Sequence, residues 1–253
     1  MESIGVVILT KNNFDYIERC LNSFKEKNTY SNLKFYIGDT GSNSNQFNLL
    51  EKYFSTFPFN VELIKFKNYN FARNHNWIVN NRVKEEYFLC CNDDIELIND
   101  AVSIMWKETA SNIGTIGCKL LYPDNTIQHG GHIHHIYNNS ADVTHKHLRQ
   151  KNKQLPTEYN VGNTFAFVLI KKSIYLDMGG LDTSYKKCFE DVDFCIKCTK
   201  HNLKHKFVGK AECYHYESVS RNKLTSSFDI EDCNKIRAAL CDHYKIKYER
   251  NFK

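Results

Sequence analysis

Two pairs of neighbouring carboxylates in this sequence are placed where they could do chemistry. The first pair, Asp93 and Asp94, directly follows the apolar stretch YFLCCN. Adjacent carboxylates at the end of a buried strand repel each other, and keeping both ionised is costly unless a cation neutralises them. Mg²⁺ or Mn²⁺ takes one or two protein carboxylates and completes its shell with ligand phosphates. The pair therefore predicts a divalent metal site, and a solvated Asp turn is the alternative interpretation.

The second pair, Glu190 and Asp191, lies at the start of a predicted helix, in FEDVDFCIKC. Unpaired amides at a helix N-terminus stabilise a carboxylate by about 0.3 to 1 kcal/mol, which would explain the pair without any function. A positioned carboxylate is also what general-base catalysis requires when a hydroxyl must lose its proton as it attacks. Further along the chain, His215 offers an imidazole that could complete a metal shell begun by Asp94, although a lone histidine is more often structural.

Two other groups of metal-binding residue types carry less weight. Six of the eleven histidines lie between His129 and His147, but they lack the HExxH pattern and the usual hydrolase spacing. A polar loop is therefore the main interpretation of that segment, and a zinc site is the alternative. Cys195 and Cys198 form a CxxC motif without a second pair at metal spacing. Small buried hydrophobic residues explain those cysteines better than zinc or redox work.

The first hundred residues alternate between predicted strands and helices. Apolar and β-branched runs predict strands at residues 4–9, 32–39, 60–66 and 86–93. Apolar side chains at helical spacing predict helices at residues 12–27, behind an Asn cap, and at residues 47–54 and 74–79. This alternation predicts a mostly parallel sheet with right-handed crossovers. Such sheets bind ligands beyond the carboxyl ends of their strands.

Polar residues follow three of these predicted strands. They are Thr10, Lys11 and Asn12 after the first strand, residues 38–45 after the second and residues 92–94 after the fourth. Because the carboxyl ends of parallel strands meet at one edge of a sheet, we expect these residues to converge on one rim.

The later half of the chain predicts a different organisation. Residues 113–131 look like a strand, a Pro-Asp-Asn turn and an irregular return, and residues 163–182 like a strand, a short helix and a Gly-Gly stop. A short strand at residues 205–209 and a loop at residues 211–222 follow the helix that begins near Glu190. The last thirty residues predict an amphipathic helix that packs on the domain or on a partner.

Composition narrows the class of protein. A chain of 253 residues with 42% hydrophobic residues can bury one substantial α/β core, and no stretch approaches the roughly 20 apolar residues that cross a bilayer. The net charge of +5 is dispersed rather than clustered, which argues against a nucleic-acid binder. We take MESIGVVILT as a first strand rather than a targeting segment, so the ten cysteines indicate a reducing compartment.

The motifs in their order resemble the family 2 glycosyltransferases with a GT-A fold. The matching segments run from VVILTKNN through GDTGSNS, YNFARNHNWIV, YFLCCNDDIEL, IGCKLLYPDNTIQHGG and FEDVDFCIKC to YHYESVSR, and they cover Ile4 to about Arg221. The likeness is greatest to bacterial-type, rhamnosyltransferase-like members that build surface polysaccharides. It implies a Rossmann-like, mostly parallel central sheet flanked by helices, followed by a C-terminal helical tail.

The resemblance also implies roles for the residues around the donor. Asp39 matches the acid that reads the nucleotide base, and Thr10 and Lys11 would line the same pocket. Asp93 matches the residue near the ribose and sugar. The charges of Arg73 and Arg221 suit contacts with the diphosphate. The segment LYPDNTIQHGG matches the loop over the donor sugar.

For the reacting groups, the resemblance implies that Asp94 binds the metal in a DxD-like triplet that begins with Asn92. His215 would join the metal or phosphate site, and Asp191 would be the catalytic base, with Glu190 beside it. The implied reaction is a single displacement with inversion. A UDP or dTDP sugar would donate, a glycan hydroxyl would accept, and Mn²⁺ or Mg²⁺ would hold the leaving diphosphate.

The expected organisation is one glycosyltransferase domain over residues 1–221, with a nucleotide-binding half at 1–95, an acceptor-binding half at 96–221 and a tail at 222–253. The expected location is cytoplasmic, with possible peripheral contact to a membrane or partner through the C-terminal helix. Two other functions remain open. A nucleotidyltransferase would want a glycine-rich loop after the first strand, where LTKNNFDY has none. A non-catalytic sugar-nucleotide or glycan-binding module would need none of the acids intact.

Overall fold

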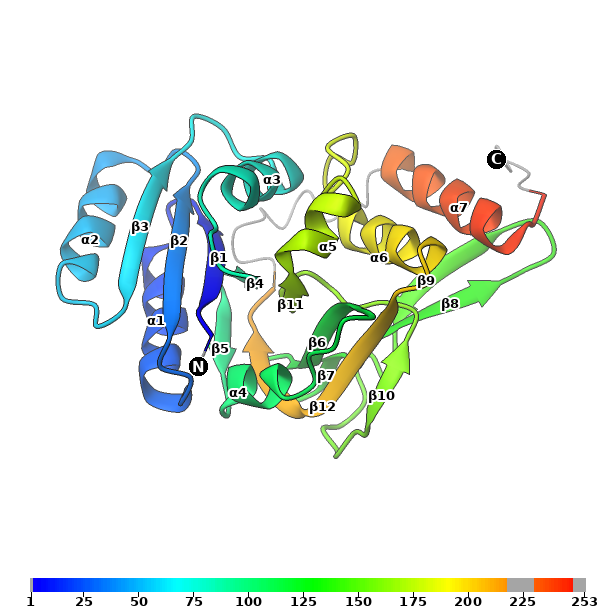
Figure 1. Cartoon of the computed structure of the whole chain (residues 1–253), viewed down its shortest axis with the longest axis horizontal. Helices are drawn as coiled ribbons and strands as arrows, with labels where there is room; N and C mark the ends of the chain where they lie inside the picture. Colours follow the sequence, from blue (N-terminus) through cyan, green and yellow to red (C-terminus); the bar gives the residue numbers. More distant parts are fainter. Residues whose placement is uncertain (1, 218–229, 248–253) are drawn as a thin grey trace.

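The computed structural model describes residues 2–217 and 230–247. Within them, ten strands form one mixed sheet in the order β10-β12-β6-β11-β4-β1-β2-β3, with β5 paired to β12 and β7 to β6. Helices cover both faces of this sheet (Figure 1). The strands and helices of the first hundred residues are β1 (Ile4–Thr10), α1 (Phe14–Lys27), β2 (Leu33–Asp39), α2 (Ser44–Phe54), β3 (Asn60–Lys65), α3 (Phe71–Asn81), β4 (Tyr87–Asn92) and β5 (Ile95–Leu97).

The four strands predicted in this part are present and parallel. In register, Thr10 of β1 lies opposite Asp39 of β2, and Leu9 lies opposite Asn92 of β4. The strand β1 is buried along its whole length because alternate side chains enter two different cores, Ile8 on one face and Val7 on the other. This is the pattern of a central parallel strand covered by helices on both sides.

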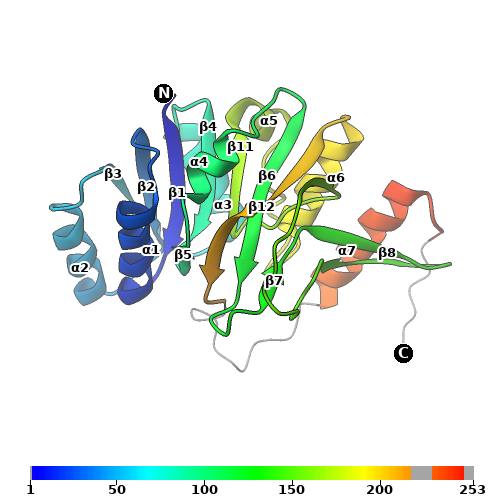
Figure 2. The same ribbon diagram turned by 90° about the horizontal axis from the view of Figure 1, so that it is seen from below.

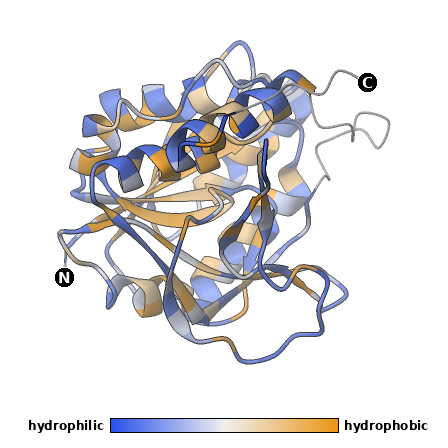
Figure 3. Ribbon diagram, turned by 90° about the vertical axis from the view of Figure 1, so that its right-hand side faces the viewer, coloured by the Kyte–Doolittle hydropathy of each residue, from blue (hydrophilic) through white to orange (hydrophobic). Residues whose placement is uncertain are grey.

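Each face of the sheet has its own helices. Buried residues of α1, α2 and α4 (Ala101–Trp106) join the core on one face. Buried residues of α3, α5 (Lys172–Asp177) and α6 (Glu190–Lys200) join the core on the other face. Figure 2 shows these two layers from below, and Figure 3 shows apolar residues gathered along the central strands. The predicted α/β fold class is confirmed.

The predicted Asn cap of α1 does not form. Asn13 occupies the N-cap position, but its side chain makes no cap hydrogen bond. Its amide Nδ2 instead donates to the carboxylate of Asp93, 2.9 Å away. The side chain that would have satisfied the helix end therefore holds an acid at the rim of the sheet.

The later half adds both parallel and antiparallel strands. Its elements are β6 (Ile113–Leu121), β7 (Ile127–His129), β8 (His132–Ile136), β9 (Ala141–His145), β10 (Thr157–Asn160), β11 (Phe167–Lys171) and β12 (Lys204–His215), with α5, α6 and α7 (Ile230–Tyr244). The strand β11 runs antiparallel to β4 and β6, whereas β12 runs parallel to β6.

Two predictions for this half are wrong. The strand predicted at residues 205–209 extends to His215, because β12 continues past a register shift between Val208 and Glu212 and then also pairs with β5. The return after the Pro-Asp-Asn turn is not irregular. It contains β7, and the segment between His129 and His147, interpreted as a polar loop, contains the antiparallel β8–β9 hairpin.

The predicted C-terminal helix is present as α7 and packs on the rest of the chain. Ile236 and Leu240 are fully buried in a small core with Ile196 of α6 and Ala141 of β9. Ile230, which the helical spacing placed on the apolar face, is 77% exposed. The side-chain packing thus answers the question that the sequence left open, at least for residues 236–241: they pack on the domain.

The cysteines form no disulfide within the described residues. Cys195 and Cys198 are buried on α6, as expected for small hydrophobic residues. None of the helices in residues 2–217 and 230–247 combines the length and the apolar character that spanning a membrane requires.

Candidate active site

The ends of β1 and β2 form the first part of the predicted rim. Thr10 and Asp39 are buried side by side in register, with 3% and 4% of their surfaces exposed. The Asp39 carboxylate accepts hydrogen bonds from the amide of Ser42, at 3.2 Å to Oδ1 and 3.4 Å to Oδ2. Lys11 directly follows Thr10 and is exposed. The amide of Ser42 thus holds the Asp39 carboxylate in place at the end of β2, where its charge can face a ligand that binds at the rim.

Asp93 links this part of the rim to the end of β4. Its Oδ2 accepts from Thr10 Oγ1 at 2.8 Å and from Asn13 Nδ2 at 2.9 Å. Burial, and then the neighbouring charge of Asp94, raises the pKa of Asp93 to about 7, although the two donors act in the opposite direction. A cation close to this pair would favour the ionised form of both acids. The expected convergence of polar residues is therefore present.

Asp94 faces His215 because β5, directly after Asp94, pairs with the end of β12. Ile95 lies opposite His215 in register, and the Asp94 carbonyl accepts from the amide of Tyr216. As a result, Asp94 Oδ1 lies 3.2 Å from His215 Nε2. Both side chains are buried. The strand pairing brings together two residues that are far apart in the sequence.

Gln128 of β7 sets the orientation of the His215 imidazole. His215 Nδ1 lies 2.6 Å from Gln128 Oε1, while Gln128 Nε2 donates to the His215 carbonyl and to Glu217. Because Gln128 Oε1 can only accept, Nδ1 carries the proton. In a neutral ring, Nε2 then presents its lone pair to Asp94 Oδ1. Asn92 Nδ2 is also within 3.3 Å of that nitrogen. A lone pair facing a carboxylate calls for a cation between them, so Asp94 and His215 fit a divalent metal.

Asp191 is held in the first turn of α6, next to the segment that leads into β11. Phe189, at the N-cap, has a left-handed backbone with φ of 76°. Asp191 Oδ1 accepts from the amide of Val192 at 2.8 Å, and Oδ2 accepts from the amide of Phe165 at 3.3 Å. The side chain is half-buried, whereas Glu190 beside it is buried with 7% exposed. Two backbone donors keep the Asp191 carboxylate in one orientation.

The base candidate and the metal candidate share a neighbour. His145 of β9 is half-buried, and the loss of solvent around its ring lowers its pKa. The Asp191 carboxylate acts against this shift, and the His215 imidazole adds to it. Both groups therefore lie within electrostatic reach of the same imidazole. Hydrogen bonds connect the same region, because the amide of Thr164 donates to His129 Nε2, next to Gln128, and the amide of Phe165 donates to Asp191 Oδ2.

Two of the predicted donor contacts are less well placed. Arg73 lies in the first turn of α3, and its side chain is exposed. The structure does not link it to the acids of the rim. Arg221 lies outside the described residues. The roles of both arginines stay predictions.

Two residues of the site went unnoticed in the sequence. Gln128 was one polar residue in a long polar segment, and nothing in its neighbours indicated His215 as its partner. Asp232 of α7 is fully buried, and its carboxylate accepts from the amides of Lys186, Lys187 and Cys188 at 2.8 to 3.4 Å. This carboxylate holds the loop that leads into α6 and Asp191. An acid on an apolar helix face was the available signal.

Comparison with solved structures shows the class of fold. The arrangement of the sheet is similar to that of three solved structures with GT-A-like folds. GalNAc-T7 with UDP, GalNAc and Mn²⁺ has a TM-score of 0.68, at 12% identity over 85% of this chain and 44% of that one. The mannosyltransferase PcManGT from Pyrobaculum calidifontis, with GDP-Man and Mn²⁺, has a TM-score of 0.63, at 12% identity over 85% and 57%. TarS of S. aureus has 0.59, at 14% identity over 85% and 37%.

The family follows from the sequence comparison. The model of glycosyl transferase family 2 matches residues 5–178, more than half of the chain, and the chain belongs to that family. This membership confirms the family and the enzyme class predicted from the motifs. The matched segment includes Asp39, Asp93 and Asp94 but ends before Asp191 and His215. For those two residues the support comes from the geometry described above.

Two curated proteins are similar over most of this chain. The O-antigen biosynthesis protein RfbC of Myxococcus xanthus is 21% identical over 229 residues, which cover 86% of this chain and 18% of RfbC. The uncharacterized protein y4gI of Sinorhizobium fredii is 25% identical over 236 residues, or 86% of this chain and 25% of y4gI. The chain thus spans no more than a quarter of the length of these relatives.

Proposed function

We propose that this protein is an inverting glycosyltransferase that moves a sugar from a nucleoside-diphosphate sugar to a hydroxyl of a glycan acceptor. One observation carries the proposal. The pair of Asp94 Oδ1 and His215 Nε2 is 3.2 Å apart and supported by Gln128, and His215 and the anchored carboxylate of Asp191 both lie within electrostatic reach of His145. A metal-binding pair beside a positioned base is what transfer from a diphosphate leaving group requires.

The donor would lie across the ends of β1, β2 and β4. In this proposal the buried Asp39 carboxylate accepts from the N3–H of a uracil or thymine, and Thr10 and Lys11 line the same pocket. Asp93 lies closer to the ribose and sugar, and Arg73 and Arg221 reach the diphosphate. A UDP or dTDP sugar fits these roles. The base remains a proposal because the similar structures hold UDP in one case and GDP-Man in another.

Asp94 and His215 would hold Mn²⁺ or Mg²⁺, and two of the similar structures were solved with Mn²⁺. When bound, such an ion neutralises the developing negative charge of the leaving diphosphate. The protein's own contribution is to select the tautomer of the neutral His215 ring that has its lone pair on Nε2, aimed at Asp94. The hydrogen bond to Gln128 does this.

Asp191 would take the proton from the acceptor hydroxyl as its oxygen attacks the anomeric carbon. One carbon–oxygen bond forms to the acceptor while the bond to the diphosphate breaks, and the configuration at that carbon is inverted. The proton then leaves Asp191 for solvent. Glu190, which is buried beside it, would contribute charge rather than accept the proton. The hydrogen bonds from Phe165 and Val192 keep the Asp191 carboxylate oriented for this step.

The same proposal includes the acceptor and the cellular location of the reaction. We infer a surface polysaccharide or other glycan as the acceptor, in line with the name of the O-antigen biosynthesis protein to which the chain is similar. The reaction would occur on the cytoplasmic face of glycan assembly, with possible peripheral contact to a membrane or partner protein. Residues 1–221 would form the transferase domain, with residues 1–95 for the donor and 96–221 for the acceptor, and residues 222–253 its tail.

Thermal unfolding with UDP, dTDP, GDP or CMP, each with and without Mn²⁺, tests the donor site. A ligand at about 100 times its dissociation constant adds about 2.7 kcal/mol to the free energy of unfolding. We expect a Mn²⁺-dependent rise with one pyrimidine diphosphate. Product analysis then separates the rival functions. A glycosyltransferase releases nucleoside diphosphate, a nucleotidyltransferase releases pyrophosphate, and a binding module releases neither. No stabilisation by any nucleotide would overturn the proposal.

A further inference from the structure

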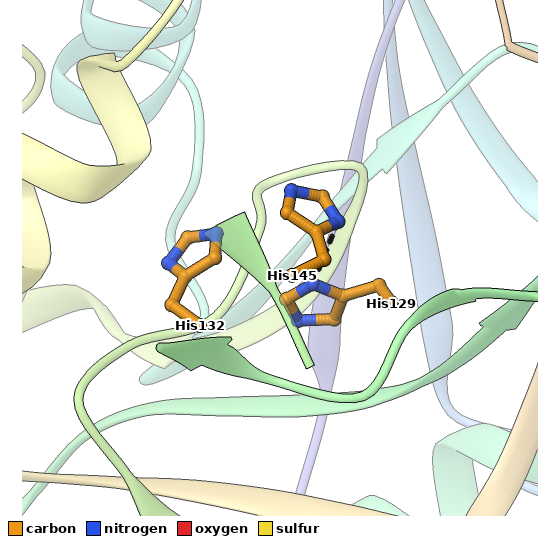
Figure 4. Close-up of side chains that lie close together, drawn as sticks. All are labelled: His129, His132 and His145. Atoms are coloured by element: carbon orange, nitrogen blue, oxygen red, sulfur yellow. Dashed lines mark hydrogen bonds between the residues drawn. The ribbon is translucent and has the colours of Figure 1, made fainter. Parts of the chain in front are cut away.

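Three histidines outside the Asp94 and His215 pair lie together beneath the β8–β9 hairpin. His129 ends β7, His132 begins β8 and His145 ends β9. Each offers one ligand atom, and these atoms all lie within 4.8 Å of one another. The three imidazoles share one small region, as Figure 4 shows. His129 and His132 are each 1% exposed, so two of the three rings are closed off from water.

The backbone explains why these three rings meet. His132 and His145 are directly opposite each other in the antiparallel register of the hairpin, a position at which side chains are in contact. Gly130 and Gly131 then connect His129 to His132 in a tight turn. Gly131 has φ of 94°, and a Cβ there would collide with the amide of Asn160. The turn therefore requires glycine, and it keeps His129 close to the hairpin.

The spacing of the nitrogen atoms suits a small metal ion. His129 Nδ1 and His145 Nδ1 are 3.2 Å apart, and His145 Nδ1 also lies 3.1 Å from the carbonyl of Gln128, a contact that a metal bound through this nitrogen would replace. In a tetrahedral zinc site, with Zn–N distances of about 2.0 to 2.1 Å, two ligand nitrogens are separated by about 3.3 Å. For the full set, whose atoms spread to 4.8 Å, each imidazole would need to move by less than about 1 Å. Rotation of the side chains is enough for that.

His132 supplies a second, independent observation. Its Nδ1 is buried and has no hydrogen-bond partner among the described residues. Leaving a buried polar nitrogen unpaired typically costs about 1 to 3 kcal/mol. A metal ion bound through this nitrogen would satisfy it.

The chemistry of the donor set selects the kind of metal. Imidazole binds metals in its neutral form, and two of these three rings are almost completely buried. A set made only of imidazole nitrogens suits Zn²⁺ and similar transition ions, whereas Mg²⁺ and Mn²⁺ prefer oxygen. The carboxylate of Asp94 gives the donor site the opposite preference.

We propose that His129, His132 and His145 bind one Zn²⁺ ion, which holds the β8–β9 hairpin against the end of β7. Three protein ligands leave a fourth position for a solvent molecule. This zinc site would have a direct consequence for the neighbouring pair of Asp94 and His215. His129 follows Gln128, the residue that orients His215, so fixing His129 also fixes the support of the donor-site metal pair. That consequence rests on the proposed function, but zinc binding itself does not.

Direct metal binding tests the site. Untagged full-length protein carrying D94A and H215A, which removes the other metal pair, is dialysed against Zn²⁺ and then analysed for bound zinc. We expect one equivalent of zinc, and Co²⁺ in its place should give the visible absorption of a tetrahedral site. His132→Gln in this background should weaken binding at least about tenfold, because the ligands supply the binding free energy.

A matched control comes from the same hairpin. His135 lies three positions along β8 from His132, and its Nε2 contacts Thr144 Oγ1 at the exposed side of β9. His135→Gln should bind zinc as the parent does. If His132→Gln does not fold, His129→Asn serves in its place, and the Co²⁺ spectrum of the parent needs no variant.

Two results would overturn the proposal. One is the absence of zinc and of a tetrahedral Co²⁺ spectrum in the folded parent. The other is unchanged binding in the His132→Gln and His129→Asn variants. Neither measurement includes a nucleotide or a sugar. A failure of the proposed transferase function, seen as no response to nucleotides, would therefore leave the zinc result unaffected and distinguishable from it.

Discussion

At the scale of single residues, the site depends on side chains that orient other side chains. His215 binds a metal through the lone pair of Nε2, and Gln128 Oε1 favours the tautomer that has this lone pair by accepting from Nδ1 at 2.6 Å. Asp191 is useful as a base only if its carboxylate points one way, and two backbone amides fix it. Each reacting group therefore has a partner whose removal should leave the group in place but badly oriented.

Substitution of Gln128 should show this dependence. Gln128→Leu removes the acceptor at His215 Nδ1, so the ring can turn or take the other tautomer. We expect Mn²⁺ affinity, measured through Mn²⁺-dependent binding of the nucleotide, to fall by about 10- to 100-fold. Gln128→Glu keeps an acceptor and should retain most of the affinity. Equal affinity in the Leu and Glu variants would show that the orientation of His215 does not depend on this contact.

Asp191→Asn tests the base. The amide keeps the shape of the side chain but cannot take a proton, so kcat should fall by roughly 10²- to 10⁴-fold. Nucleotide binding, measured by calorimetry, should be nearly unchanged, because Asp191 does not contact the donor in the proposed arrangement. Asp193→Asn is the control, since Asp193 lies on the same turn of α6 and pairs with Lys197. Full turnover in Asp191→Asn would disprove the assignment of the base.

The acids of the site could be predicted from the sequence, but their supports could not. Asp93 and Asp94 follow a recognisable strand, and ligands bind at the ends of such strands. Gln128 and His215 are separated by 87 residues, and no local pattern pairs them. Asn13 looked like a helix cap, and the structure uses it on Asp93 instead. Contacts across the fold decide these roles, and a sequence shows only neighbours along the chain.

At the scale of the elements, α7 positions the base through a loop. Asp232 accepts from the three amides of residues 186–188, which directly precede Phe189 and α6. The small core formed by Ile236, Leu240 and Ile196 keeps α7 against α6. The helix therefore supports the transferase site through both its apolar face and one buried acid.

Asp232→Ala should loosen that loop. Each hydrogen bond to a charged group contributes about 1.5 to 3 kcal/mol, and three amides lose their acceptor here, so the free energy of unfolding should fall by at least about 3 kcal/mol. We also expect kcat to fall more than the KM of the donor rises, because the loop orients Asp191 rather than the nucleotide. Asp242 lies on the same helix as Asp232 and forms an exposed salt bridge with Lys200 of α6. Asp242→Asn should change neither the stability nor kcat. A loss of stability with normal kcat would limit Asp232 to a structural role.

The elements that the sequence did not predict share a physical cause. The predicted strand stopped near Gly209 because the alternation of β12 breaks there, at the register shift between Val208 and Glu212. The β8–β9 hairpin has histidines at positions where strands usually carry apolar residues, so its pattern looked like a loop. For α7, helical spacing marked the right face, but Ile230 lies before the segment that packs on α6 and β9 and is exposed.

At the scale of the whole molecule, the mixed sheet joins strands from both predicted halves, and the site lies where they meet. A sheet of this size also contains buried histidines, and these lower the free energy of unfolding at low pH. His75 on α3 and His205 on β12 are each 1% exposed, and burial lowers the pKa of both to about 4. Neither residue belongs to the proposed donor site, so their effect on stability can be separated from ligand binding.

The sign of the pH dependence follows from these values. Between about pH 6.5 and 4 the unfolded chain binds a proton on each histidine and the folded protein does not, so stability falls as the pH falls. Each of the two histidines should lower the free energy of unfolding by roughly 1.4 kcal/mol at pH 5.5 and by about 3 kcal/mol at pH 4. Urea unfolding of the nucleotide-free protein across this range measures the slope.

His75→Leu separates this term from the rest of the molecule. Leucine fills a similar volume and does not titrate, and the lost contact of Nδ1 is to the carbonyl of Phe71 on the same helix. The difference in free energy of unfolding between pH 7 and pH 5.5 should shrink by roughly 1.4 kcal/mol. His201→Gln, at an exposed position, should leave the difference unchanged. If His75→Leu kept the full slope, the acid sensitivity would have to come from other buried groups, with the imidazoles beneath the β8–β9 hairpin as the next to test.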